Sequence, residues 1–257
     1  MNWMPYSREL EVVLAAVRRA GDNALGYWRT GIAADAKSDD SPVTAADREC
    51  ERLLVQDLCA QFPEDGILGE EGANKASGSG RRWILDPIDG TRDFVRGNRM
   101  WCVMAALEVD GEVTLGVVHF PALGDTYHAV RGAGAFRNGE RMRVSSIAEA
   151  SQAVLCVNAL NHLQEFAFGR KLLEWIRGFW AVRSMGGAQD SMLVASGSAE
   201  AWIEPVAQAW DLAPMKVITE EAGGRFFNFD GGNSIHAGNC VTCVPALETM
   251  MRRFVAS

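Results

Sequence analysis

The N-terminal part of the chain places apolar and polar residues at the spacing of two amphipathic helices. In the first, apolar residues recur every three or four positions, at Leu10, Val13, Leu14, Val17 and Leu25. The second is predicted over residues 44–62, where Thr44 is followed three positions later by Asp47. That pair has the form of a capping box, in which each side chain accepts a hydrogen bond from the other residue's backbone. Residues 34–43 between them are polar and turn-rich, and predict a loop.

The middle of the chain has the patterns of β-strands. Residues 65–72 are predicted as a short strand that ends in an acidic turn, 73–80 as a flexible loop and 81–86 as a buried strand. Asp-Gly and Asn-Gly pairs at 110–111 and 138–139 then mark turns between successive strands. An antiparallel meander is therefore predicted over residues 101–109, 112–120, 125–130 and 134–145.

The C-terminal part alternates between strands and helices. Strands are predicted over residues 153–160, 179–184, 199–205, 225–229 and 240–244. Helices are predicted over residues 165–178, 188–197 and 210–224, and a short helix at the end of the chain. Because no repeat or linker interrupts this order, we expect one α+β unit over residues 1–257, with sub-halves of about 1–148 and about 149–257.

Composition and charge narrow the class of protein. Of the 257 residues, 48% are hydrophobic and 23% charged, which is ordinary for a globular protein. No apolar run is long enough to cross a bilayer, and the N-terminus lacks the features of a signal peptide, so a cytoplasmic protein is expected. The net charge of −8 argues against a nucleic-acid partner. An acidic protein that acts on anions needs a metal to reverse the local field.

Six cysteines are scattered along the chain, and two of them, Cys240 and Cys243, form a C-x-x-C pair. Such a pair is compatible with a redox or metal site. There is no second pair, and the flanking residues have the pattern of a strand. Core packing is therefore the favoured interpretation.

Acidic residues gather where predicted elements begin or end. Glu70 and Glu71 follow one strand, Asp86 and Asp89 follow another, and Asp211 opens a helix, where it could serve only as a cap. Asp86 and Asp89 are harder to explain structurally, since two neighbouring carboxylates repel unless a cation lies between them. Hard oxygen ligands without His or Cys indicate Mg²⁺ rather than zinc.

Gly90 and Thr91 follow this pair directly and resemble the start of a helix, whose free backbone N–H groups bind anions such as phosphate. Carboxylates beside an anion site indicate metal-assisted phosphoryl transfer. Other phosphatase chemistries do not fit the sequence. No Cys has an Arg six residues later, the aspartates are spaced D-x-x-D rather than D-x-D, and no Arg-His pair or Walker loop occurs. An activated water is the remaining nucleophile.

Several motifs together resemble the inositol monophosphatase family. They are SPVTAAD (41–47), GEEG (69–72), WILDPIDGTRDFVRG (83–97), WDLA (210–213) and EEAGG (220–224). The resemblance implies a layered αβαβα sandwich of the inositol monophosphatase and fructose-bisphosphatase type. It also implies Mg²⁺-dependent, lithium-sensitive hydrolysis of a small phosphorylated metabolite by a homodimer. The net charge and the absence of a long apolar run separately predict that neither nucleic acid nor a membrane is a partner.

The resemblance also assigns roles to residues. Glu70, Asp86 and the Ile88 carbonyl would hold one Mg²⁺, and Asp86, Asp89 and Asp211 a second, while Glu71 could bear on a third ion or be a solvated turn residue. Gly90 and Thr91 would bind the phosphate. Thr91 and Asp47 would orient or deprotonate the attacking water, with help from Glu70. Asp89, Glu204 and Asp211 would contact the substrate. These assignments are expectations carried over from the family.

The substrate is less constrained by the sequence. FVRG (94–97) and Trp101 are similar to the histidinol-phosphate phosphatase branch, although members of that branch commonly carry an Asp where this chain has Gly187. Arg96 and Trp101 are equally compatible with a surface charge and a core aromatic. Glu204 suits a protonated amine or a hydroxyl. We expect hydrolysis of L-histidinol phosphate, with an inositol phosphate, a broader range of monoesters or a regulatory binding role as the alternatives.

Overall fold

The computed structural model describes residues 5–31, 35–36 and 42–257. Most of the predicted loop over residues 34–43 lies outside these ranges, as does Ser41 of the motif that ends at Asp47. The described parts of this loop form a short antiparallel pair, β1 (Asp35–Ala36) and β2 (Pro42–Val43). Within the described residues, no helix has the length and apolar character needed to cross a membrane.

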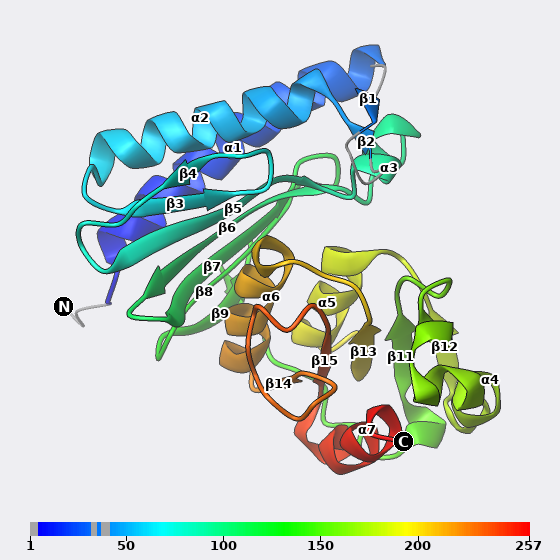
Figure 1. Ribbon diagram of the computed structural model, residues 1–257. Coiled ribbons are helices and arrows are strands. Elements are labelled where there is room, and N and C mark those ends of the chain that lie inside the picture. Colours follow the sequence, from blue (N-terminus) through cyan, green and yellow to red (C-terminus); the bar gives the residue numbers. More distant parts are fainter. Residues whose placement is uncertain (1–4, 32–34, 37–41) are drawn as a thin grey trace.

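Helices and sheets stack in alternating layers (Figure 1). Helices α1 (Ser7–Thr30) and α2 (Ala45–Gln61) cover one face of an eight-stranded sheet. Helices α5 (Gly187–Ala195) and α6 (Ala209–Glu221) lie between this sheet and a five-stranded one. Helix α7 (Glu248–Val255) packs on the outer face of the second sheet. This order of layers confirms the predicted αβαβα sandwich.

The eight-stranded sheet contains the predicted meander. Its order is β10-β9-β8-β7-β6-β5-β3-β4, and strands β5 to β9 pair with their sequence neighbours in antiparallel fashion. Strand β3 runs parallel to β5. Strand β4 forms in the segment predicted as a flexible loop, because its backbone pairs with β3. The strands are β3 (Gly66–Gly69), β4 (Asn74–Lys75), β5 (Arg81–Asp89), β6 (Cys102–Val109), β7 (Glu112–Phe120), β8 (Asp125–Val130), β9 (Gly134–Arg137) and β10 (Glu140–Arg141).

The five-stranded sheet has the order β12-β11-β13-β15-β14, with β11 parallel to both of its neighbours. Its strands are β11 (Val154–Val157), β12 (Ala181–Arg183), β13 (Ala201–Glu204), β14 (Arg225–Phe227) and β15 (Cys240–Cys243). Cys240 and Cys243 are both buried free thiols in the core. The structure thus confirms core packing for the C-x-x-C pair.

The helix predicted over residues 165–178 is confirmed only in part. Residues 167–178 are helical, but only α4 (Leu172–Trp175) is α-helical; the turns on either side of it are 3₁₀, and the backbone breaks at Phe166. Phe166 and Phe168 pack on each other with ring centroids 5.6 Å apart, and each contacts Phe229 at 5.1 Å. Residues two positions apart point in different directions on a helix, so this shared contact favours an irregular backbone.

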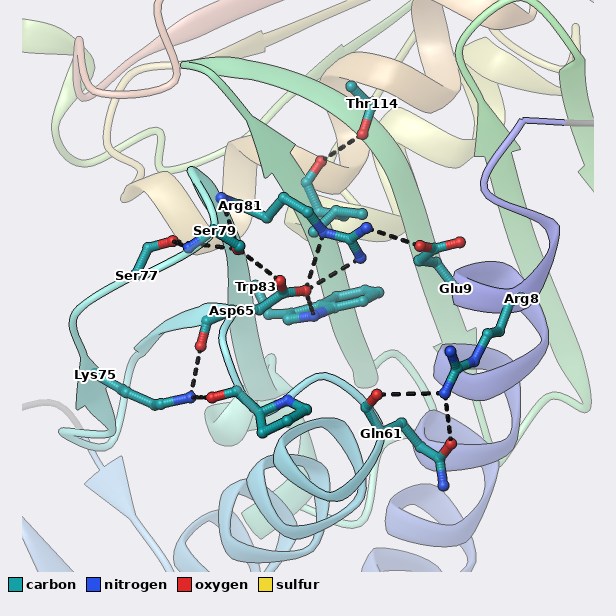
Figure 2. Close-up of polar contacts among 12 residues, drawn as sticks. Arg8, Glu9, Gln61, Asp65, Lys75, Ser77, Ser79, Arg81, Trp83 and Thr114 are labelled. Carbon is teal, nitrogen blue, oxygen red and sulfur yellow. Dashed lines mark hydrogen bonds and ion pairs between the residues drawn. The ribbon is translucent and has the colours of Figure 1, made fainter.

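A buried polar network fixes the first helix to the start of β5 (Figure 2). The buried Asp65 carboxylate accepts hydrogen bonds from Ser79 Oγ at 2.7 Å, Arg81 Nε at 3.1 Å and Trp83 Nε1 at 3.1 Å. Arg81 also pairs with Glu9 of α1, with Nη1 and Oε1 2.8 Å apart. The network therefore fixes the N-terminal end of the strand whose other end carries Asp86 and Asp89.

Candidate active site

Strand β5 brings Asp86 and Asp89 to the edge of a cleft. Asp86 pairs with Met104 of β6, and the register then shifts before Asp89 pairs with Cys102. The intervening Pro87 and Ile88 thus interrupt the ladder between the two carboxylates. A Pro has no N–H to give to a ladder, so an irregularity at this position is expected. The predicted strand over residues 81–86 extends to Asp89.

Asp211 reaches the same place from α6. One oxygen each of Asp86, Asp89 and Asp211 lies within 4.8 Å of the others. Asp211 is not the N-cap but the third residue of the helix, and its Oδ2 accepts a hydrogen bond from the Gln208 backbone at 2.6 Å. The Asp211 side chain can therefore cap the helix and also belong to the carboxylate cluster, because a carboxylate has several acceptor sites.

Burial and mutual repulsion raise the pKa of all three carboxyl groups. The pKa of Asp89 rises to about 6 and that of Asp211 to about 7, in each case mainly through burial. Burial, followed by repulsion from Glu70, Asp211 and Asp89, raises the pKa of Asp86 well above its ordinary value. A hydrogen bond of 3.2 Å from the Ala188 backbone opposes the shift at Asp89.

These carboxylates fit a hard divalent cation. Asp86 Oδ1 is buried and has no hydrogen-bond partner within the described part of the chain. A buried carboxylate oxygen without a donor is costly unless a cation approaches it. The donors are all oxygen atoms, which suits Mg²⁺ better than zinc.

Glu51 of α2 holds the acidic turn after β3. Its two carboxylate oxygens accept hydrogen bonds from the backbone of Glu71 and of Ala73, each at 2.9 Å. The turn presents Glu70 to the cleft, but Glu71 is not among the residues that line it. Glu51, a residue of the helix layer, therefore fixes the turn that positions Glu70 at the cleft.

Asp47 and Thr91 form a second polar pair beside the carboxylates. Asp47 Oδ2 accepts hydrogen bonds from the Thr44 backbone at 2.8 Å and from Thr44 Oγ1 at 2.5 Å, which completes the predicted capping box of α2. Its Oδ1 accepts from Thr91 Oγ1 at 3.2 Å, and this hydroxyl is also 3.1 Å from the Ile88 carbonyl oxygen. Burial raises the pKa of Asp47, while the bonds from Thr44 oppose the shift.

Gly90 joins β5 to the short helix α3 (Thr91–Val95), as predicted for a helix start at this point. Its φ of +83° lies in the left-handed region, and an added Cβ would lie 2.8 Å from the Met100 carbonyl oxygen. Both observations require glycine here, since other residues rarely adopt this conformation and have no room. Trp101 is fully buried against Phe94, with ring centroids 4.9 Å apart, and is thus a core aromatic.

The cleft has a volume of about 320 Å³ and joins both halves of the chain. Its lining comprises Glu70, Asp86, Ile88, Asp89, Gly90, Thr91, Arg92, Asp93, Asn158, Gly186, Gly187 and Asp211. Asp47, Arg96 and Glu204 are not among these residues. The buried Glu204 instead accepts a hydrogen bond from Asn158 Nδ2 at 2.6 Å, and burial raises its pKa to about 8.

Four lining residues were not identified from the sequence: Arg92, Asp93, Asn158 and Gly186. Arg92 and Asp93 lie inside the motif over residues 83–97, where the paired aspartates dominate the pattern. Asn158 directly follows β11, and a polar residue at the end of a buried strand was an available signal. Gly186 had no such signal, because only the fold brings it opposite α3.

The sequence matches the model of the inositol monophosphatase family over residues 6–255. The chain is 42% identical to a histidinol-phosphatase from Chlorobaculum parvum, over 97% of this chain and 96% of that protein. It is 37% identical to a histidinol-phosphatase from Mycobacterium tuberculosis, over 91% and 92%. An IMPase structure from Thermotoga maritima superimposes with a TM-score of 0.87 at 31% identity, covering 96% of each chain.

Fold, cleft and relatives together define a phosphoric monoester hydrolase. The chain belongs to the inositol monophosphatase family. The predicted resemblance is therefore confirmed. Metal dependence is typical of this family, and a carboxylate cluster suited to a metal is present in the cleft.

Proposed function

We propose that this protein hydrolyses L-histidinol phosphate to L-histidinol and inorganic phosphate. The observation that carries the proposal is the convergence of Asp86, Asp89 and Asp211 within 4.8 Å, in a chain 42% identical to a histidinol-phosphatase. The convergence supports the phosphatase chemistry, and the identity supports the substrate.

In this proposal, Glu70, Asp86, Asp89, Asp211 and the Ile88 carbonyl hold two Mg²⁺ ions. Bound Mg²⁺ lowers the pKa of water and offsets the negative charge of the phosphate. With the ions bound, the buried carboxylates would repel one another less and would stay ionised.

The protein's own groups orient the reaction. The backbone N–H groups of Gly90 and Thr91 bind phosphate oxygens at the start of α3. Asp47 accepts a proton through the Thr91 hydroxyl, which lies 3.2 Å from its Oδ1. Glu70 helps to hold the attacking water. Glu204 does not line the cleft, but it accepts a hydrogen bond from Asn158, which does. We therefore infer that Glu204 orients the Asn158 side chain and that Asn158 contacts the alcohol part of the substrate.

Phosphate release from two substrates tests the proposal. Purified protein with Mg²⁺ is expected to show a kcat/KM for L-histidinol phosphate at least about 10-fold above that for myo-inositol 1-phosphate, because one charge-assisted hydrogen bond contributes about that factor. Chelation with EDTA should abolish both activities. Equal, slow rates on both substrates would refute the histidinol phosphate assignment and indicate a broad-specificity enzyme.

The main alternative substrate is an inositol phosphate. It is supported by the likeness to the Thermotoga maritima IMPase. A kcat/KM that is higher for myo-inositol 1-phosphate would select this alternative. A regulatory binding role would be selected if Asp89→Asn abolished turnover and left the cellular phenotype unchanged.

A further inference from the structure

Two carboxylates that line the cleft, Glu70 and Asp93, lie outside the cluster of Asp86, Asp89 and Asp211. Asp93 belongs to α3 and faces the loop before α5, because an ideal Cβ placed on Gly186 would lie 3.8 Å from Asp93 Oδ2. The next residue, Gly187, lies between the site carboxylates and the second sheet. Its ideal Cβ would be 3.7 Å from both carboxylate oxygens of Asp89 and 3.8 Å from Asn158 Nδ2.

Because neither glycine has a side chain, a space remains open beside Gly186 and Gly187. Asp93 bounds it on the side of α3, and Asn158 on the side of β11. A side chain at either glycine position would enter this space. If the phosphate binds beside Gly90, as proposed, the alcohol part of the ester would extend into this space, because the space adjoins Asp89 at one edge.

The Asp93 carboxylate is held in a defined orientation. Its Oδ1 accepts a hydrogen bond of 2.6 Å from Asn98 Nδ2. Asn98 is itself fixed, since its Oδ1 accepts from the Met100 backbone at 3.1 Å and its carbonyl oxygen accepts from Trp28 Nε1 at 3.1 Å. One Asp93 oxygen is thus tied to the loop after α3, and the other is directed toward the Gly186 side of the cleft. Such an arrangement lowers the cost of binding a partner.

The charge of the cleft indicates what that partner is. Among the described residues that line the cleft, Arg92 is the single one with a cationic side chain, and that side chain is exposed. Two Mg²⁺ ions would balance Glu70, Asp86, Asp89 and Asp211, and would leave Asp93 as an additional negative charge beside the alcohol subsite. A carboxylate that accepts hydrogen bonds favours a protonated nitrogen over a neutral hydroxyl, because the hydrogen bond is then charge-assisted on both sides.

We propose that Asp93 is a specificity-determining residue that binds a cationic nitrogen on the alcohol part of the substrate. This inference rests on the proposed phosphatase function and deepens it, since it names the group that selects an aminoalcohol phosphate. In this arrangement the acidic group comes from α3 and lines the cleft together with Asn158.

The test compares Asp93→Asn with the unchanged protein on a cationic and a neutral substrate. The variant keeps the size of the side chain but loses its charge. Its amide oxygen can still accept the hydrogen bond from Asn98 Nδ2. We expect KM for L-histidinol phosphate to rise about 10-fold or more, with kcat changed less than about threefold. The KM for myo-inositol 1-phosphate should remain within about twofold. Asp93→Glu should restore part of the selectivity.

Asp22→Asn is the matched control, because it removes one exposed negative charge from α1, outside the residues that line the cleft. It should leave both KM values unchanged. An equal loss on both substrates in Asp93→Asn would show that Asp93 acts through the fold, and would overturn the proposal. An unchanged ratio of the two kcat/KM values would overturn it as well.

The same variants separate this inference from the proposed function. If the unchanged protein prefers myo-inositol 1-phosphate, the histidinol phosphate assignment fails, but a selective loss for the cationic substrate in Asp93→Asn still supports the role of Asp93. If L-histidinol phosphate is not turned over, its inhibition constant against myo-inositol 1-phosphate replaces KM. Absence of inhibition in the unchanged protein would then overturn both.

Discussion

Thr91 Oγ1 lies 3.2 Å from Asp47 Oδ1, although the two residues are 44 positions apart. The contact joins the start of α3 to the first turn of α2. Asp47 has a second role, because its other oxygen accepts the hydrogen bonds of the Thr44 cap. A helix cap thus fixes the orientation of the carboxylate that we propose as proton acceptor.

Replacing the Thr91 hydroxyl tests this pair. Thr91→Ala is expected to lower kcat by about 10²- to 10⁴-fold, since a positioned proton-transfer group contributes that range. Thr91→Ser retains the hydroxyl and should keep most of the activity. Steady-state phosphate release at saturating Mg²⁺ measures both, and circular dichroism checks the fold. Similar losses in Ala and Ser would contradict a role for the hydroxyl.

Divalent cations should stabilise the protein through the carboxylate cluster. At a Mg²⁺ concentration of 100 times the dissociation constant, binding to the folded state adds about 2.7 kcal/mol. For a chain of this size that increment corresponds to a rise in Tm of roughly 5–10 °C. Asp211→Asn should lose most of the rise while its amide oxygen still accepts from the Gln208 backbone. Thermal denaturation with EDTA and with Mg²⁺ measures the difference, and Asp22→Asn is the control. An equal rise in Asp211→Asn would exclude this residue as a ligand.

Glu204 should make stability depend on pH. Burial raises its pKa from 4.5 to about 8, so between these values the folded state keeps a proton that the unfolded state has lost. The contribution of Glu204 to stability is therefore complete below about pH 4.5 and is lost as the pH rises toward 8, with a slope of at most about 1.4 kcal/mol per pH unit. Glu204→Gln lacks this dependence. Its unfolding free energy relative to the unchanged protein should rise from pH 5 to pH 8 in metal-free denaturant titrations, whereas parallel curves would contradict the shift.

The network around Asp65 should contribute to stability without affecting catalysis. Asp65→Ala leaves the buried Trp83 Nε1 without an acceptor, while Arg81 keeps its ion pair with Glu9, so the expected cost is about 1–3 kcal/mol. The Mg²⁺-dependent kcat below the new Tm should be unchanged, because Asp65 does not line the cleft. Arg52→Ala removes an exposed ion pair with Glu49 and should leave Tm unchanged. A loss of kcat in folded Asp65→Ala would show that the network also positions the site.

The strands, most helices and the acidic residues at their ends were predicted from local patterns, whereas the order of the layers and the convergence of the three aspartates were implied by the family resemblance. Asp86 and Asp89 follow a strongly apolar strand, and Asp211 is near the start of a helix. Two kinds of feature were not predictable in this way. The segment over residues 165–178 was predicted as one helix, but it breaks at Phe166 and is mostly 3₁₀, and its Phe166 and Phe168 contact the distant Phe229. The pairing of Asn158 with Glu204 likewise depends on adjacent strands that are separated along the chain.

Helix α6 lies between the two sheets and carries Asp211, whereas Asp86 and Asp89 belong to β5. An ion bound by all three carboxylates would therefore link the eight-stranded sheet to the middle layer of helices. The geometry of the ion site then depends on the spacing between these two layers. Substitutions at buried positions of α6 outside the cleft, such as Met215 and Ile218, should therefore weaken the affinity for the ion as well as the stability of the fold.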